Sequence, residues 1–120
     1  MSLDPPDLEP FRCELDRRRE FVRISPVGEL DIATVPVVEG HLDECEAAGV
    51  KQVVLDLREV CFLDSTGLRL ILERDARSRA DGFAFSLIAG PPTVQRLFDL
   101  TLTTERLNFV AASEAETRTG

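Results

Sequence analysis

A nearly continuous run of apolar residues in the middle of the chain, Val53-Val54-Leu55-Asp56-Leu57, most constrains its fold. Runs of this kind, interrupted here by a single acid, are typical of a strand that is buried on both faces of a sheet. A helical pattern of about 15 residues precedes the run, and a strand pattern precedes that helix. A strand, a helix and a second strand form a crossover unit, and such units are right-handed. The run therefore predicts an α/β fold with this strand near its centre.

Two segments, one on each side of this run, have apolar residues at helical spacing. In the first segment four such residues share one face: Val35, Val38, Leu42 and Cys45. Thr34 fits the N-cap of this helix, and Gly49 fits its end. The second segment should place Leu68, Ile71, Leu72 and Ala76 inward and Arg69, Glu73, Arg74, Arg77 and Ser78 outward. Gly82 should end this second helix.

Further strands and a third, short helix are predicted around these elements. Strands are expected over residues 11–16, 21–27, 83–89 and 107–111, and the short helix should be capped by Thr93, with Val94, Leu97 and Phe98 inward. Pro26 cannot donate to a ladder, so it indicates an edge or a bulge near the end of the second strand. The order β-β-α-β-α-β-α-β implies a mixed four- to five-stranded sheet with helices packed mainly on one face.

The ends of the chain are predicted to lie outside the folded domain. Residues 1–10 are acidic and carry three prolines, so we expect a flexible N-terminal arm there. Residues 11–112 should form the domain itself. Residues 113–120 should form a polar C-terminal tail, with room for one helical turn.

Charge and cysteine content narrow the classes of partner. The net charge is −8, so neither nucleic acid nor an anionic membrane surface, both of which attract Lys and Arg, is a predicted partner. No segment approaches the roughly 18 consecutive apolar residues of a membrane span. Cys13, Cys45 and Cys61 are far apart and form no CxxC pair. We interpret them as buried, reduced thiols of a cytoplasmic protein.

The stretch over residues 60–72 holds the clearest functional signal. An apolar approach reaches Asp64, Ser65, Thr66 and Gly67, and an amphipathic helix then begins. This arrangement delivers a hydroxyl to the positive end of a helix, where free N–H groups and the helix dipole favour an added phosphate. In the simpler alternative, Asp64 or Ser65 is an ordinary N-cap. The local residues leave both interpretations open.

The chain lacks the parts of common enzymatic sites. A Ser-His-Asp arrangement would need His41, the only histidine, beside Ser65, and nothing in the spacing supports that. There is no P-loop and no dinucleotide fingerprint. Glu29, Asp31 and Asp64 could form an acidic Mg²⁺ site, although each also has an ordinary role as a loop or cap residue. We therefore predict no catalytic residue, no metal and no cofactor, and interpret His41 as a surface or boundary residue.

The remaining interpretation is that a hydroxyl group of this chain is modified by another protein. Phosphate on Ser65 would add about −1.5 to −2 charges and three strong acceptors next to Asp64, while the helix N-terminus would partly stabilise it. A partner docked over this helix start would then be ejected by charge repulsion and desolvation cost, without a large rearrangement of the fold. The stretch thus predicts a switch that acts through local electrostatics.

Three motifs stand in a fixed order along the chain. They are Gly28-Glu29-Leu30-Asp31 before the first helix, Phe62-Leu63-Asp64-Ser65-Thr66-Gly67-Leu68 at the start of the second, and Val94-Gln95-Arg96-Leu97-Phe98-Asp99-Leu100 in the third. With them the chain resembles the STAS domain, and within that family the small bacterial anti-sigma factor antagonists. Two segments depart from the family pattern: 113–120 is shorter than its usual last helix, and 101–104 lacks the glycine that many members carry in a turn.

The resemblance implies a partner switch. The unphosphorylated antagonist binds an anti-sigma factor that is also a serine kinase with a GHKL-type ATP site, and this frees a sigma factor. The kinase phosphorylates the antagonist, and a PP2C-type phosphatase reverses the modification. By position the acceptor is Ser65, with Thr66 as a secondary candidate. The implied partner-binding residues are Asp31, Asp64, Ser65, Thr66, Gly67 and Arg69.

Two other functions stay open beside this one. The chain could be a STAS module that senses a small ligand or nucleotide, or that serves as a scaffold in another signalling complex. It could also be a small hydrolase that uses Ser65, which the single histidine disfavours.

Overall fold

The structure is a computed structural model, and it describes residues 10–117, without the side chains of residues 116 and 117. Residues 1–9 of the predicted arm and residues 118–120 of the predicted tail lie outside the described residues. The elements are β1 Arg12–Arg18, β2 Phe21–Leu30, α1 Val35–Ala47, β3 Gln52–Asp56, β4 Val60–Leu63, α2 Ser65–Asp81, β5 Ala84–Ile88, α3 Pro92–Leu100, a 3-10 turn Thr104–Arg106, β6 Phe109–Val110 and α4 Ala112–Thr117.

The strands form one mixed sheet, as predicted. Its order is β1-β2-β3-β5-β6, with β4 paired to β2. Only β1 and β2 pair antiparallel, and the other pairs are parallel. Within residues 10–117 the sheet has six strands, one more than the upper expectation. The additional strand is β4, which the sequence patterns did not reveal.

The proline in β2 stands where this strand changes its partner. β2 pairs with β3 as far as Ile24 and with β4 from Gly28 onward. Gly28 N donates to Glu59 O, and Pro26, two residues earlier, faces the same side of the strand. The N–H group that Pro26 lacks would therefore lie between β3 and β4, the two successive partners of β2. The predicted edge position is wrong, because β2 is an interior strand, but a register shift does follow, between Gly28 and Glu29.

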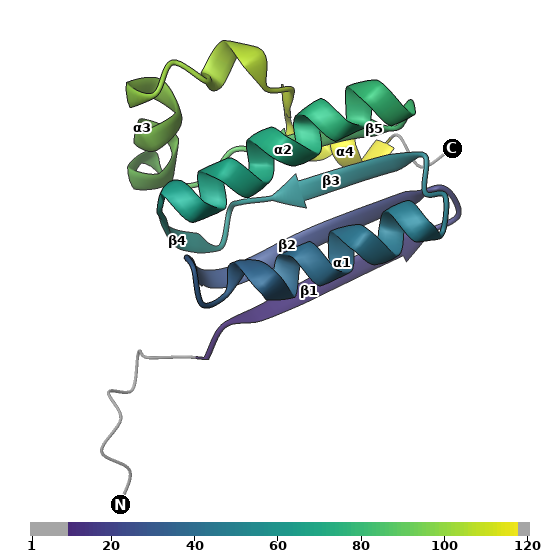
Figure 1. The fold of residues 1–120 in the computed structure, drawn as a ribbon, viewed down its shortest axis with the longest axis horizontal. Coiled ribbons are helices and arrows are strands. Elements are labelled where there is room, and N and C mark those ends of the chain that lie inside the picture. Colours follow the sequence, from purple (N-terminus) through teal and green to yellow (C-terminus); the bar gives the residue numbers. More distant parts are fainter. Residues whose placement is uncertain (1–9, 118–120) are drawn as a thin grey trace, which may run out of the picture.

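Helices cover the two faces of the sheet to different extents. Helices α1 and α2 lie side by side on one face (Figure 1), where they share the main core with α3. The predicted inward face of α1 is confirmed, because all four of its residues are buried. The short helix α4 covers part of the other face, where Ala115 packs with Phe21, Val54 and Ile88. The prediction of helices mainly on one face is confirmed.

Several side chains lie elsewhere than the helical patterns indicated. On α2, Arg74 and Ser78 are buried although we expected them outward, and Ala76 is exposed although we expected it inward. Ser78 is satisfied by its own helix, since its Oγ donates to Asp75 O at 2.7 Å. The predicted cap of α3 is also wrong: its N-cap is Pro91, and Thr93 lies inside the helix.

A buried acid on the sheet face opposite α1 and α2 gives a pH-dependent contribution to stability. Asp56 Oδ2 accepts from Arg58 Nη2 at 2.7 Å. Burial raises the pKa of Asp56, but the hydrogen bonds from Arg58 and the positive charges of Arg58 and Arg23 together lower it by more, so the net pKa lies below the ordinary value of 3.8. A carboxyl group whose pKa is lower in the folded state stabilises that state above its unfolded pKa.

Asp56→Asn should therefore cost about 1–2 kcal/mol of unfolding free energy near neutral pH, because it removes a charge-assisted pair. The difference from the unmodified protein should shrink as the pH falls below 3.8, where Asp56 becomes protonated during unfolding and then in the folded state. Urea titrations of both proteins across the acidic range measure this difference. A gap that stays constant down to the acid limit would contradict the role of the ionised carboxylate.

Candidate functional site

Two of the motifs that lie far apart in the sequence meet at one end of the sheet. Leu30, the last residue of β2, pairs with Leu63, the last residue of β4, and Asp64 N donates to Leu30 O at 3.4 Å. The two strands are parallel, so the residues that follow them emerge next to each other. Asp31 and Asp64 are these residues, and the first turns of α1 and α2 lie beside each other at this end (Figure 1).

The start of α2 is capped by the acid and not by the hydroxyl. Asp64 has extended backbone angles, and its Oδ1 accepts from Thr66 N at 2.9 Å and from Gly67 N at 3.1 Å. Ser65 is the first helical residue, and it is exposed. Within residues 10–117 no hydrogen bond engages its hydroxyl. Asp64 thus resolves the choice of cap and leaves the Ser65 hydroxyl free at the positive end of the helix.

The two hydroxyls of the motif are presented differently. Ser65 is exposed, whereas Thr66 is partly buried. Both follow Asp64 within the first turn of α2. Ser65 is therefore the more accessible of the two hydroxyl-bearing residues.

The loop between β2 and α1 is held rigid by Asp31 and Thr34. Asp31 Oδ1 accepts from Ala33 N at 3.0 Å and from Thr34 N at 3.2 Å. The Thr34 hydroxyl accepts from Asp31 N at 2.9 Å and donates to Glu29 O at 2.7 Å. Thr34 occupies the predicted N-cap position of α1, yet its side chain bonds back into the loop and caps no helical N–H group. Ile32, which lies in this loop, is exposed.

Gly67 is buried and packs closely against the ends of β2 and β4, and its predicted partner contact stays a prediction. A Cβ atom built on this residue would overlap Leu63 Cδ1 and would lie 3.0 Å from Leu30 O. The first turn of α2 therefore rests directly on the ends of β2 and β4. This close approach fixes the height at which Ser65 stands above the sheet.

Gly67→Ala should destabilise the fold by about 1–2 kcal/mol, because the overlap with Leu63 and Leu30 outweighs the better helix propensity of alanine. Gly40→Ala is the matched control, since Gly40 lies in α1 with nothing within 4 Å of an added Cβ. That change should stabilise the fold by up to about 1 kcal/mol. Urea unfolding of the two variants measures both signs, and two changes of the same sign would contradict the packing argument.

The remaining predicted residues lie on α1 and α2. Arg69 is exposed on α2, as predicted. His41 lies in α1 and is partly buried, which fits a boundary residue, and within residues 10–117 its Nδ1 has no hydrogen-bond partner. Among the described residues no group of three or more His, Cys, Asp or Glu side chains is placed to hold a metal ion.

The cysteines differ from one another in exposure. Cys45 is buried and Cys13 is half-buried, and burial raises the pKa of Cys13 to about 11. Cys61 is exposed on β4, so our expectation that all three thiols are buried is wrong for this residue. The pattern of β4, in which Val60 and Leu63 are buried and the two residues between them are exposed, explains the miss.

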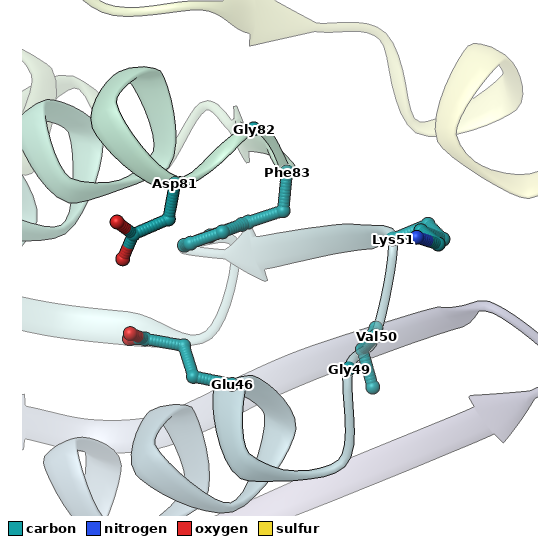
Figure 2. A pocket seen from close by; sticks show the side chains of 7 residues that line it. All are labelled: Glu46, Gly49, Val50, Lys51, Asp81, Gly82 and Phe83. Atoms are coloured by element: carbon teal, nitrogen blue, oxygen red, sulfur yellow. The ribbon is translucent and has the colours of Figure 1, made fainter.

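A hollow at the other end of the helix pair holds two acids. It measures about 250 Å³ and lies between the C-terminal ends of α1 and α2. Figure 2 shows that the carboxylates of Glu46 and Asp81 face the same gap, with the Phe83 ring beside Asp81, while Lys51 points away. Glu46 is already paired with Arg74 and Arg77. The described residues that line this hollow include no serine, cysteine or histidine, so it offers no nucleophile or base of that kind.

The part of the chain that the structure describes contains no helix long and apolar enough to cross a membrane.

Comparisons with known proteins agree with this fold. A family model described as "STAS domain" matches residues 12–116. The anti-sigma-B factor antagonist of Staphylococcus aureus is 25% identical over 106 residues, which cover 88% of this chain and 98% of that protein. Among solved structures, an anti-sigma factor antagonist from Mycobacterium paratuberculosis is 23% identical with a TM-score of 0.74, covering 98% of each chain. SpoIIAA, an anti-sigma factor antagonist in its unphosphorylated form, is 25% identical with a TM-score of 0.72, covering 91% of this chain and 95% of that one.

Proposed function

The chain belongs to the STAS domain family, and on this premise we propose that it is an anti-sigma factor antagonist that phosphorylation of Ser65 switches off. One observation carries the proposal: the Ser65 hydroxyl is exposed and unbonded at the N-terminus of α2, because Asp64 does the capping. Relatives with this fold are named anti-sigma factor antagonists, which supports the same role here. The protein acts by binding, as a cytoplasmic regulator, and not by catalysis.

The partner is an anti-sigma factor that is also a serine kinase with a GHKL-type ATP site. The unphosphorylated antagonist binds it and so releases a sigma factor. The kinase transfers the γ-phosphoryl group of ATP to Ser65 Oγ, which loses its proton, and ADP leaves. A PP2C-type phosphatase hydrolyses the phosphoserine and releases inorganic phosphate, which restores the binding form.

The switch needs little movement. Phosphate on Ser65 would be stabilised in part by the helix dipole, and it would stand beside the carboxylate of Asp64, whose orientation two backbone N–H groups fix. The added charge of about −1.5 to −2 changes what the surface attracts while the packing under Gly67 stays as it is. A partner that lies over this helix start is then repelled, and Asp31 in the adjoining loop adds to the negative charge.

The test is to map phosphate on the protein. The chain is incubated with ATP and, one at a time, with each purified anti-sigma factor kinase encoded in the genome it comes from, and phosphopeptides are identified by mass spectrometry. We expect one kinase to modify Ser65, with no incorporation into Ser65→Ala. Incorporation that survives the double change Ser65→Ala, Thr66→Ala would contradict the site. Modification by none of these kinases would contradict the function.

A further inference from the structure

An apolar hollow lies directly beside the switch residues, between β4 and α3. It measures about 210 Å³, and its walls include Cys61, Phe62, Leu97 and Leu100. Phe62 is 48% exposed and Leu100 is 73% exposed, and both belong to the small set of large apolar side chains that the described residues leave open to solvent. Apolar side chains gathered around one concave site, unlike scattered ones, mark surfaces that other molecules cover.

The rim of this hollow carries the positive charge of Arg96. Arg96 also lines it and is exposed. Within residues 10–117 no hydrogen bond or ion pair engages its guanidinium, even though the chain has 22 acids and only 14 Lys and Arg residues. An unpaired arginine next to exposed apolar side chains is complementary to a partner segment that carries both an apolar and an acidic side chain.

The hollow adjoins the surface around Asp64 and Ser65, which we call the switch surface. Phe62 and Leu63 line it, and the next two residues of the chain are Asp64 and Ser65. In Figure 1, α3 lies at the same end of the sheet as β4 and the start of α2. A protein that covers Ser65 with an interface of ordinary size, about 800 Å² on each side, must also extend over neighbouring surface of this kind.

We propose that the β4–α3 hollow is a second part of the docking surface for the anti-sigma factor: it takes an apolar side chain of that partner, while an acidic residue of the same segment pairs with Arg96. The inference rests on the proposed function and adds to it the chemistry of the partner segment. The hollow supplies affinity and the Ser65 region supplies the switch, so substitutions in the hollow weaken binding without changing which residue is phosphorylated.

The test measures binding to the anti-sigma factor kinase that phosphorylates the protein, by calorimetry with ADP present so that no phosphate is transferred. Leu100→Ser and Arg96→Glu should each weaken binding about tenfold or more, the size of an interface hot spot. Two changes serve as matched controls. Leu102→Ser alters an exposed leucine outside the hollow, and Arg19→Glu reverses a charge at the β1–β2 turn. Both should stay within about twofold of the unmodified protein.

Other outcomes separate this inference from the proposed function. If Ser65→Asp abolishes binding while Leu100→Ser and Arg96→Glu bind like their controls, the hollow is not a docking site and the switch stands. Equal losses for Leu100→Ser and Leu102→Ser would show a non-specific effect of surface apolarity, and would also overturn the inference. If the protein self-associates in sedimentation and Leu100→Ser abolishes that association, a second copy occupies the hollow and the inference is wrong. If no kinase binds the unmodified protein, the proposed function itself falls, and the inference falls with it.

Discussion

Ser65→Asp should weaken binding of the anti-sigma factor at least about a hundredfold, whereas Ser65→Ala should leave it within about threefold. The Ser65 hydroxyl is exposed and makes no hydrogen bond within residues 10–117, so alanine removes nothing that the fold uses. A carboxylate at this position stands next to Asp64, which cannot turn away because Thr66 N and Gly67 N hold its Oδ1. Like charges juxtaposed in an interface cost several kcal/mol, and each 1.4 kcal/mol is about a factor of ten in affinity.

Two further variants distinguish the effect of the added charge from the effects of side-chain size and of position in the fold. Ser65→Asn has nearly the shape of the aspartate variant without its charge, so it should bind much like the unmodified protein. Ser113→Asp adds the same charge at an exposed serine in α4, which covers the other face of the sheet, and should also bind normally. Calorimetric titrations at two salt concentrations complete the test, because salt should reduce the effect of the Ser65 charge. If the asparagine variant loses as much affinity as the aspartate variant, ejection is steric and the electrostatic mechanism is wrong.

The helix start at residues 64–67 could be predicted because the residues that form it are neighbours in the sequence. Asp64, Ser65 and Gly67 lie within four residues, and the requirements of a helix start relate them to one another. The identity of the cap could not be predicted, since aspartate and serine both satisfy N–H groups in that position. It depends on the backbone angles of Asp64, which the pairing of β4 with β2 sets.

The strand β4 escaped prediction for a related reason. Its four residues follow a buried-exposed-exposed-buried order, which matches neither the alternation of a half-buried strand nor the continuous run of a central one. β4 forms because the end of β2, Gly28–Leu30, extends beyond β3 and needs another strand to pair with. The two paired segments are about 30 residues apart in the sequence, so local periodicity does not show that they pair. The meeting of Asp31 with Asp64 depends on the same pairing.

Arg74→Ala should destabilise the fold by about 2–3 kcal/mol, although sequence periodicity placed this residue in solvent. Its side chain is only 4% exposed, and it joins α2 to α1 through Asp43 at 2.7 Å, through Glu46 and through Glu39 at 3.9 Å. Burial lowers the pKa of this guanidinium, and the hydrogen bonds to Asp43 and Glu46 raise it by more, so it stays charged. The three acids lie on α1, where no pattern within α2 could reveal them.

Removing the arginine leaves those acids near one another, and within residues 10–117 the exposed Arg77 is then the one basic residue paired with Asp43 and Glu46. The cost stays below that of a fully buried pair because Asp43 and Glu39 remain open to water and can be solvated. Arg74→Met keeps most of the buried stem, so it should cost about 1 kcal/mol less than Arg74→Ala, although it leaves the same acids without their partner. Arg77→Ala is the matched control: it removes an exposed arginine that pairs with two of the same acids, and should change stability by less than about 0.5 kcal/mol. Urea unfolding measures all three variants. Equal losses for Arg74→Ala and Arg77→Ala would show that the pairs act as surface charges, and that burial of Arg74 between the helices contributes nothing.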